Sequence, residues 1–89
     1  MFKILIQGVN KKLFKRIEYN GKIYNRTDTP VIGGIAECLK DDNWSTSGRF
    51  YLIGDYILGD GNSTSIIGDD GEPCGMHKHF ANKDYYYYK

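Results

Sequence analysis

The stretch KLFKRIEYNGKIYNRT, residues 12–27, decides how this chain begins to fold. Asn20-Gly21 separates two runs that favour β-structure. A two-residue type I′ turn needs positive φ at both central positions, and Asn-Gly is the pair that provides it most readily. We therefore predict an antiparallel hairpin in which residues 12–19 pair with residues 22–27.

The remainder of the chain shows the same pattern of short strands. Residues 2–9, FKILIQGV, alternate apolar and polar side chains, which predicts a half-buried strand. Residues 49–58, RFYLIGDYIL, are apolar on both faces, which is typical of a central strand or of one whose second face meets a partner. Residues 63–69 favour another strand, and residues 40–48 have the composition of a loop.

Two segments keep more than one interpretation. Residues 31–39, VIGGIAECL, fit a bulged strand or a short helix, because Gly33-Gly34 disfavours a regular form of either. The run YYYYK, residues 85–89, cannot bury both of its faces alone, so we expect an edge strand or disorder. We therefore divide the chain into one barrel-like domain over residues 1–84 and a tyrosine-rich tail over 85–89.

Turn signals complete the prediction of the fold. GDGN at 59–62 and DDGE at 69–72 each predict a tight turn, and HKHFANKD at 77–84 allows a single helical turn. Five or six short strands fit a small antiparallel barrel or a strongly bent sheet, because closure removes exposed edges. We predict a mainly β domain with at most one short helix.

Length and composition restrict the class of protein. Eighty-nine residues suffice for one domain, and the eight tyrosines argue against disorder. No apolar run approaches the roughly 18 residues of a membrane span, and no basic region precedes the apolar start. The chain has two cysteines and no CxxC spacing, so we expect a reduced, cytoplasmic protein without a disulfide. We also expect no membrane segment.

The net charge of +1 conceals an asymmetry along the chain. Residues 1–26 carry seven basic residues and one acidic residue, whereas residues 27–76 carry two basic and nine acidic residues. Two solvated faces of opposite sign would explain this. Attraction between the halves, within one molecule or between two copies, and a basic face for a polyanion are the alternatives.

The stretch SIIGDDGEPCGMHKHF, residues 65–80, gathers carboxylates, a cysteine and two histidines. Its ligand spacings match neither a zinc site nor a calcium loop, and Asp69-Asp70-Gly71 is explained as a turn. No nucleophile elbow or phosphate-binding loop occurs in the chain, and Cys74 and His77 lack further support as a catalytic pair. We therefore predict a protein without a metal, a cofactor or a catalytic site.

The hairpin NGKIY (20–24) and the segment TSIIGDDGEPCGMHKHFANK (64–83) resemble small SH3-like barrel proteins of bacteriophages. The matching positions are Gly21, Lys22 and Tyr24, Asp69 to Glu72, and Phe80, whose ring is expected to plug the barrel end. Residues 30–60 depart from the pattern. The resemblance implies a viral accessory protein that acts in the host bacterial cytoplasm by binding rather than by chemistry.

Three classes of function stay open. The first is a protein that inhibits or modulates a host protein or defence complex. The second is a module that binds or sequesters a nucleotide or nucleic acid, because aromatic and basic residues together can stack on bases and contact phosphates. The third is a metal-dependent enzyme. We also expect a homodimer or larger assembly, because residues 49–58 offer more apolar surface than one sheet face needs.

The candidate binding residues lie in and around the region 40–56, which includes the predicted loop at 40–48. Loops held by a scaffold often carry function, and Trp44 is the single tryptophan of the chain. It is either a contact residue or a lid on the core. Tryptophan, tyrosine and arginine most often dominate binding energy. The predicted contact residues are Trp44, Arg49 and Tyr51, with Lys15 and Arg16 as charged support for an anionic ligand.

Overall fold

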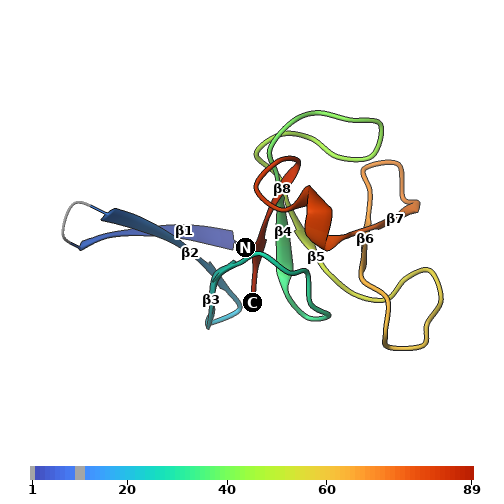
Figure 1. Cartoon of the computed structure of the whole chain (residues 1–89), viewed down its shortest axis with the longest axis horizontal. Helices are drawn as coiled ribbons and strands as arrows, with labels where there is room; N and C mark the ends of the chain where they lie inside the picture. Colours follow the sequence, from blue (N-terminus) through green and yellow to red (C-terminus); the bar gives the residue numbers. More distant parts are fainter. Residues whose placement is uncertain (1, 10–11) are drawn as a thin grey trace.

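The computed structural model describes residues 2–9 and 12–89, with side chains from residue 16 onward (Figure 1). These residues form eight strands and one short 3₁₀ helix. In chain order the elements are β1 (Phe2–Val9), β2 (Lys12–Tyr19), β3 (Lys22–Thr27), β4 (Ile35–Cys38), β5 (Phe50–Leu52), β6 (Ser65–Ile67), β7 (Pro73–Gly75), η1 (Lys78–Phe80) and β8 (Tyr85–Tyr88).

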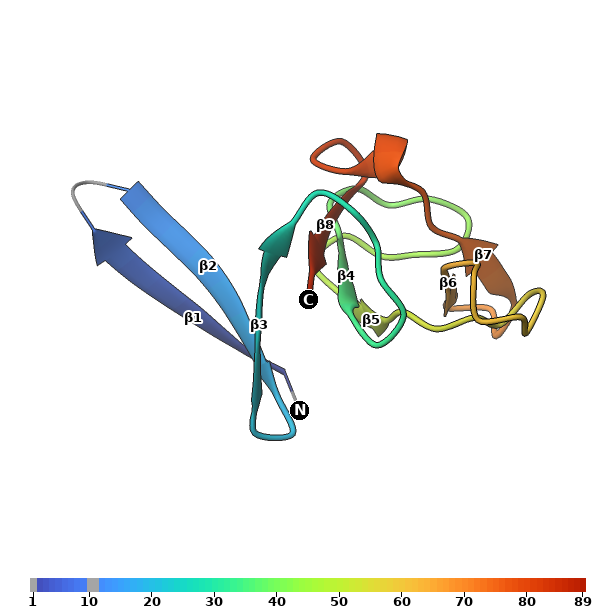
Figure 2. The same cartoon turned by 60° about the horizontal axis from the view of Figure 1, so that its bottom comes forward.

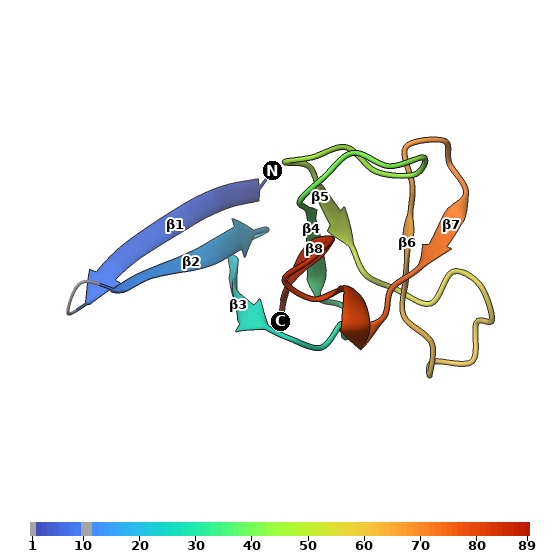
Figure 3. The ribbon, with the colours of Figure 1, turned by 45° about the horizontal axis from the view of Figure 1, so that its top comes forward.

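Six strands form one antiparallel sheet in the order β1-β2-β3-β8-β4-β5, and β6 pairs with β7 in a second, two-stranded sheet. The β1–β2 hairpin extends away from the body of the molecule, and β6–β7 lies at the opposite end (Figures 1 and 2). In Figure 3 the sheet turns sharply between this hairpin and β4–β5. The predicted class, a mainly β chain with a strongly bent antiparallel sheet, is confirmed.

The β2–β3 hairpin has the predicted strands and the predicted turn. Tyr19 pairs with Lys22, and Ile17 pairs with Tyr24 on the core side. Asn20 and Gly21 take φ values of 52° and 79°, as a type I′ turn requires. This local signal therefore fixes the register of the hairpin.

The tyrosine run forms a central strand, and the expectation of an edge strand or a disordered tail is wrong. β8 lies between β3 and β4, with Thr27 opposite Tyr87 and Cys38 opposite Tyr85. Lys89 continues the ladder, because its N–H and C=O both bond to Asn25. Residues 85–89 thus belong to the same sheet as the preceding residues.

Both faces of β8 are covered because the sheet curls around it. Tyr85 and Tyr87 pack into one core cluster, whereas Tyr88 packs into another. The three rings are at most 3% exposed, and each hydroxyl has a partner: Ser45 Oγ at 2.7 Å from Tyr85, His77 O at 2.9 Å from Tyr87, and Glu37 Oε1 at 2.7 Å from Tyr88. Tyrosine suits such positions, since its ring is apolar and its end is polar.

The ambiguous segment 31–39 contains the strand β4, and all four of its residues are buried. A turn precedes the strand, closed by a bond from Gly34 N–H to Val31 O at 2.9 Å. A Cβ on Gly34 would lie 2.5 Å from the carbonyl oxygen of Tyr88. Glycine therefore lets β4 begin directly beside β8, and the strand interpretation is correct.

For the segment 49–58 the predicted length and the central position are both wrong, whereas the alternative, a strand whose second face meets a partner, stays a prediction. β5 has three residues and lies at the end of the six-stranded sheet. Beyond it, the carboxylate of Asp55 accepts the N–H groups of Leu58, Gly59 and Gly61, at 3.2, 2.9 and 2.7 Å. These bonds fold residues 55–62 into a loop in place of a longer strand.

Candidate functional site

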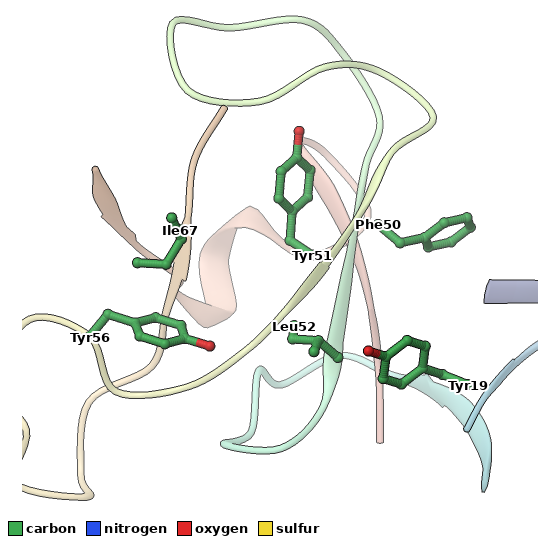
Figure 4. A pocket seen from close by; sticks show the side chains of 6 residues that line it. All are labelled: Tyr19, Phe50, Tyr51, Leu52, Tyr56 and Ile67. Carbon is green, nitrogen blue, oxygen red and sulfur yellow. The ribbon is translucent and has the colours of Figure 1, made fainter. Parts of the chain in front are cut away.

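An apolar groove runs along the outer side of β5. We call it the β5 groove, and it has a volume of about 290 Å³. In the view of Figure 4, the hydroxyl ends of Tyr19 and Tyr56 point toward Leu52 from opposite sides. The groove is lined by Tyr19, Phe50, Tyr51, Leu52, Tyr56 and Ile67.

Three apolar side chains of the groove are open to solvent. Leu52, Tyr56 and Ile67 are exposed by 39%, 44% and 41%. Alternation explains Ile67, since Ile66 beside it is wholly buried in the core. Exposed apolar residues are unremarkable singly, but a contiguous group marks an interaction surface.

The Tyr56 ring depends on a glycine for its place in the groove. A Cβ on Gly54 would meet the ring carbon Cζ at 2.7 Å and the hydroxyl at 2.9 Å. The backbone of Gly54 is itself fixed by a bridge to Ser65, which joins the end of β5 to β6. The two sheets therefore meet at Gly54 and Ser65, and the Tyr56 ring lies against Gly54 at that junction.

The carboxylate of Asp69 holds the loop before β5 in place. Its Oδ1 accepts bonds from Arg49 Nη1 at 2.9 Å and from the Tyr51 hydroxyl at 2.8 Å. The Oδ2 atom accepts a bond from the Thr46 hydroxyl at 2.6 Å. The backbone N–H of Asp69 donates to the carbonyl oxygen of Trp44 at 2.7 Å. Asp69 is therefore more than the turn residue that the sequence indicated.

This network sets the charge state of its members. Hydrogen bonds from Thr46 and Tyr51, with the charge of Arg49, hold the pKa of Asp69 below its usual value. Burial raises the pKa of Tyr51, and the bond to Asp69 adds to that effect. At neutral pH the arrangement is a carboxylate that accepts bonds from a neutral phenol and a guanidinium.

Asp42 fixes the tip of the same loop around Trp44. Its Oδ1 accepts the N–H groups of Trp44 and Ser45, both at 2.7 Å, and the Ser45 hydroxyl at 2.9 Å. Ser45 is buried and also bonds to the Tyr85 hydroxyl. The loop is therefore anchored at Asp42 and at Asp69.

Trp44 lines a second pocket, of about 230 Å³, which we call the Trp44 pocket. The indole is 43% exposed, but it adjoins the buried Met76 and Tyr85. Trp44 thus has features of both roles that the sequence left open, a lid on the core and an accessible contact residue. The pocket is lined by Asp42, Trp44, Cys74, Met76, Phe80, Asp84 and Tyr85.

The structure brings together only some of the predicted contact residues. Arg49 and Tyr51 meet at Asp69, whereas Trp44 lines a different pocket. Arg16 lies on β2, opposite Asn25, and lines neither pocket. The side chain of Lys15 lies outside the described residues. Sequence reasoning missed Leu52 and Ile67, although each follows the alternation of its strand.

The two histidines lie beside the ring of Phe80. His77 and His79 stack with ring centroids 5.4 Å apart, and Phe80 meets them edge-on at 5.3 and 4.4 Å. Phe80 packs in turn against the larger core cluster. Among the described residues, no three His, Cys, Asp or Glu side chains are grouped to hold a metal ion.

Cys74 is a weak candidate for a nucleophile. Burial raises the pKa of its thiol, and the nearby carboxylates of Asp42 and Asp70 raise it further. The thiolate is the reactive form, so this environment disfavours it. Both Cys74 and the buried Cys38 are free thiols.

A comparison with protein families, curated proteins and solved structures found no match. Within the part of the chain that is described, no helix has the length and apolar character needed to cross a membrane.

Proposed function

We propose that this chain is a non-enzymatic protein-binding module that docks its partner in the β5 groove. The observation that carries the proposal is the contiguous exposure of Leu52, Tyr56 and Ile67 beside the last strand of the sheet. Rigid aromatic residues at the centre of such a groove are typical anchors of binding energy. The anchored loop at 40–49 keeps one wall of the groove in place.

The charge of the segment 27–76, to which five of the six groove-lining residues belong, indicates the chemistry of the partner. Residues 27–76 carry nine acidic and two basic residues, and one of those two, Arg49, is paired with Asp69. A partner surface with apolar side chains and a basic rim is therefore complementary. The resemblance to phage accessory proteins adds the proposal that this partner is a host protein in the bacterial cytoplasm, which the chain inhibits or modulates.

Binding of a nucleotide or nucleic acid has weaker support. Among the described residues that line the β5 groove, none is lysine or arginine. The Arg26 guanidinium lies 3.6 Å from the centre of the Tyr86 ring, so this pair is already stacked. A second copy of the chain is the other occupant to be considered, because the homodimer expected from residues 49–58 would use the same surface.

A capture experiment with matched variants tests the proposal. The tagged chain is incubated with bacterial lysate, beside Leu52→Asp and Ile67→Asp in the groove and Ile23→Asp outside it. Ile23 is 38% exposed on β3, so it controls for the loss of one accessible apolar side chain. Each groove variant should weaken binding of a stoichiometric protein about tenfold or more, and Ile23→Asp should not.

Circular dichroism shows whether each variant is folded before capture. A protein retained equally by all variants would place the binding surface elsewhere. A co-purifying nucleotide in place of a protein would favour the alternative function, and exchange between differently tagged copies of the chain would identify a homodimer.

A further inference from the structure

The Trp44 pocket has a different lining from the β5 groove and shares no residue with it. Three aromatic rings and two carboxylates line it, and no lysine or arginine is among its described residues. Its volume of about 230 Å³ is below the roughly 300–1,000 Å³ of pockets for drug-sized ligands. The pocket is therefore suited to a small group, and its charged residues favour a cation.

The aromatic walls are held in place before any ligand binds. Tyr85 is 3% exposed, and Phe80 lies against it with ring centroids 6.5 Å apart and the planes at 52°. The stacked histidines fix Phe80 from its other side. Trp44 remains 43% exposed, with its backbone anchored by Asp42. A cation within about 6 Å of such rings is attracted by their π-electrons, most strongly by tryptophan.

The carboxylates of Asp42 and Asp84 are the two acidic groups of the pocket. Asp42 Oδ1 accepts three bonds, whereas Oδ2 has one long contact, with the Tyr85 hydroxyl at 3.4 Å. Asp84 pairs with Lys40 at 3.0 Å, but the lysine side chain is 66% exposed. Asp42 Oδ2 therefore keeps capacity to accept from a ligand, and a ligand cation would compete with the exposed Lys40 for Asp84.

Groups in the pocket respond to this negative charge. Burial is the first cause that raises the pKa of both Cys74 and Tyr85, and the charge of Asp42 raises each further. Tyr85 and Cys74 are therefore neutral at physiological pH. Because Asp84 is paired with Lys40, Asp42 is the carboxylate of the lining whose charge no cation among the described residues offsets.

We propose that the Trp44 pocket binds a methylated ammonium group against Trp44 and Phe80 and beside the carboxylates of Asp42 and Asp84, with the buried Tyr85 packed against Phe80. A bare metal ion does not suit this pocket, because it needs a close cluster of ligands that the described residues do not form. A primary ammonium is strongly hydrated and would lose that water against apolar walls. Methyl groups lower the hydration and contact the rings.

Trp44 is the only tryptophan, so its fluorescence reports directly on the pocket. The chain is titrated with choline and with the uncharged isostere of choline, in which a tert-butyl group replaces trimethylammonium. Sodium chloride at equal ionic strength is the blank. Choline should change the emission saturably, and the isostere should bind about tenfold more weakly or less. Equal binding of the two, or no saturable change with choline, would overturn the proposal.

Matched charge variants separate a local contact from the general effect of charge. Asp84→Asn removes a carboxylate from the pocket, and Asp28→Asn removes one from the segment after β3, outside the pocket. Both variants change the net charge equally. Asp84→Asn should weaken choline severalfold and leave the isostere unaffected, whereas Asp28→Asn should change neither. An equal effect of the two variants would contradict a specific site.

A third comparison distinguishes the source of the ligand. A peptide with trimethyllysine and the same peptide with unmodified lysine are titrated beside choline. Tighter binding of the trimethyllysine peptide than of choline assigns the pocket to modified proteins, and the reverse assigns it to free small molecules. Preference for unmodified lysine would overturn the proposal.

Discussion

A chain that ends at Asp84 is expected to be unfolded at 25 °C. The truncation removes β8, which joins β3 to β4, so the sheet would separate into a three-stranded and a two-stranded part. It also removes three rings that are at most 3% exposed. Loss of one large buried aromatic side chain costs about 3–5 kcal/mol, and a small domain has about 5–15 kcal/mol in total. The free energy lost by the truncation therefore exceeds the total free energy of unfolding expected for a domain of this size.

Single substitutions in β8 provide the graded form of this prediction. Tyr87→Ala should lower the free energy of unfolding by about 3–5 kcal/mol, because the ring is wholly buried. Tyr86→Ala is the matched control, since Tyr86 is only half-buried, beneath Arg26. Urea denaturation followed by circular dichroism measures both. A folded chain without residues 85–89, or equal effects of the two substitutions, would show that β8 is not the centre of the core.

The second large effect is expected at alkaline pH, where the buried tyrosines should drive unfolding. Burial raises the pKa of Tyr85, Tyr87 and Tyr88, and the bond to Glu37 raises that of Tyr88 further. An unfolded tyrosine has a pKa of about 10, so these groups leave stability unchanged below that pH. Above it, the unfolded state releases protons that the folded state retains, and stability falls.

The slope of this loss is about 1.4 kcal/mol per pH unit for each tyrosine that stays neutral in the folded state. Three such groups give about 4 kcal/mol per pH unit, so the chain should unfold cooperatively within a few units above pH 10. Tyrosinate absorbance and far-UV circular dichroism, recorded together, measure this. The three ionisations should coincide with loss of the sheet signal. Ionisation of all eight tyrosines in a chain with an intact sheet would contradict the burial of β8.

Local signals in the sequence predicted the hairpin and the turns. Asn20-Gly21 needs only its own backbone geometry, and the turn at 69–72 closes as expected through a bond from Gly68 N–H to Glu72 O. The single helical turn at η1 also lies within the predicted segment 77–84. In each case the deciding interactions connect residues close in sequence.

The position of β8 could not be predicted from its own residues. Four consecutive tyrosines do not show which strands lie beside them, and burial of both faces depends on Ile17 and Ile66, far away in the chain. The same limit applies to Gly34. A side chain at this position would collide with the carbonyl oxygen of Tyr88, which is far away in the sequence. The position of β8 and the glycine at position 34 therefore depend on contacts between residues far apart in the sequence.

The predicted binding region 40–56 overlaps the β5 groove, to which it contributes Phe50, Tyr51, Leu52 and Tyr56. Arg49 and Tyr51 both bond to Asp69, and their role in binding stays a prediction. Asp69 was assigned to a turn alone, because its partners Arg49 and Tyr51 precede it by 20 and 18 residues. The role of Trp44 was left open by the sequence, and in the structure Trp44 lines a separate pocket.

Photocrosslinking from the groove tests most directly whether the β5 groove is the protein-binding surface. A photoreactive phenylalanine analogue replaces Ile67 in one chain and Ile23 in another, two positions with similar exposure of 41% and 38%. After irradiation in lysate and mass spectrometry, position 67 is predicted to form an adduct with one other protein, and position 23 is predicted to form none. An adduct at position 23 with none at position 67 would contradict the account.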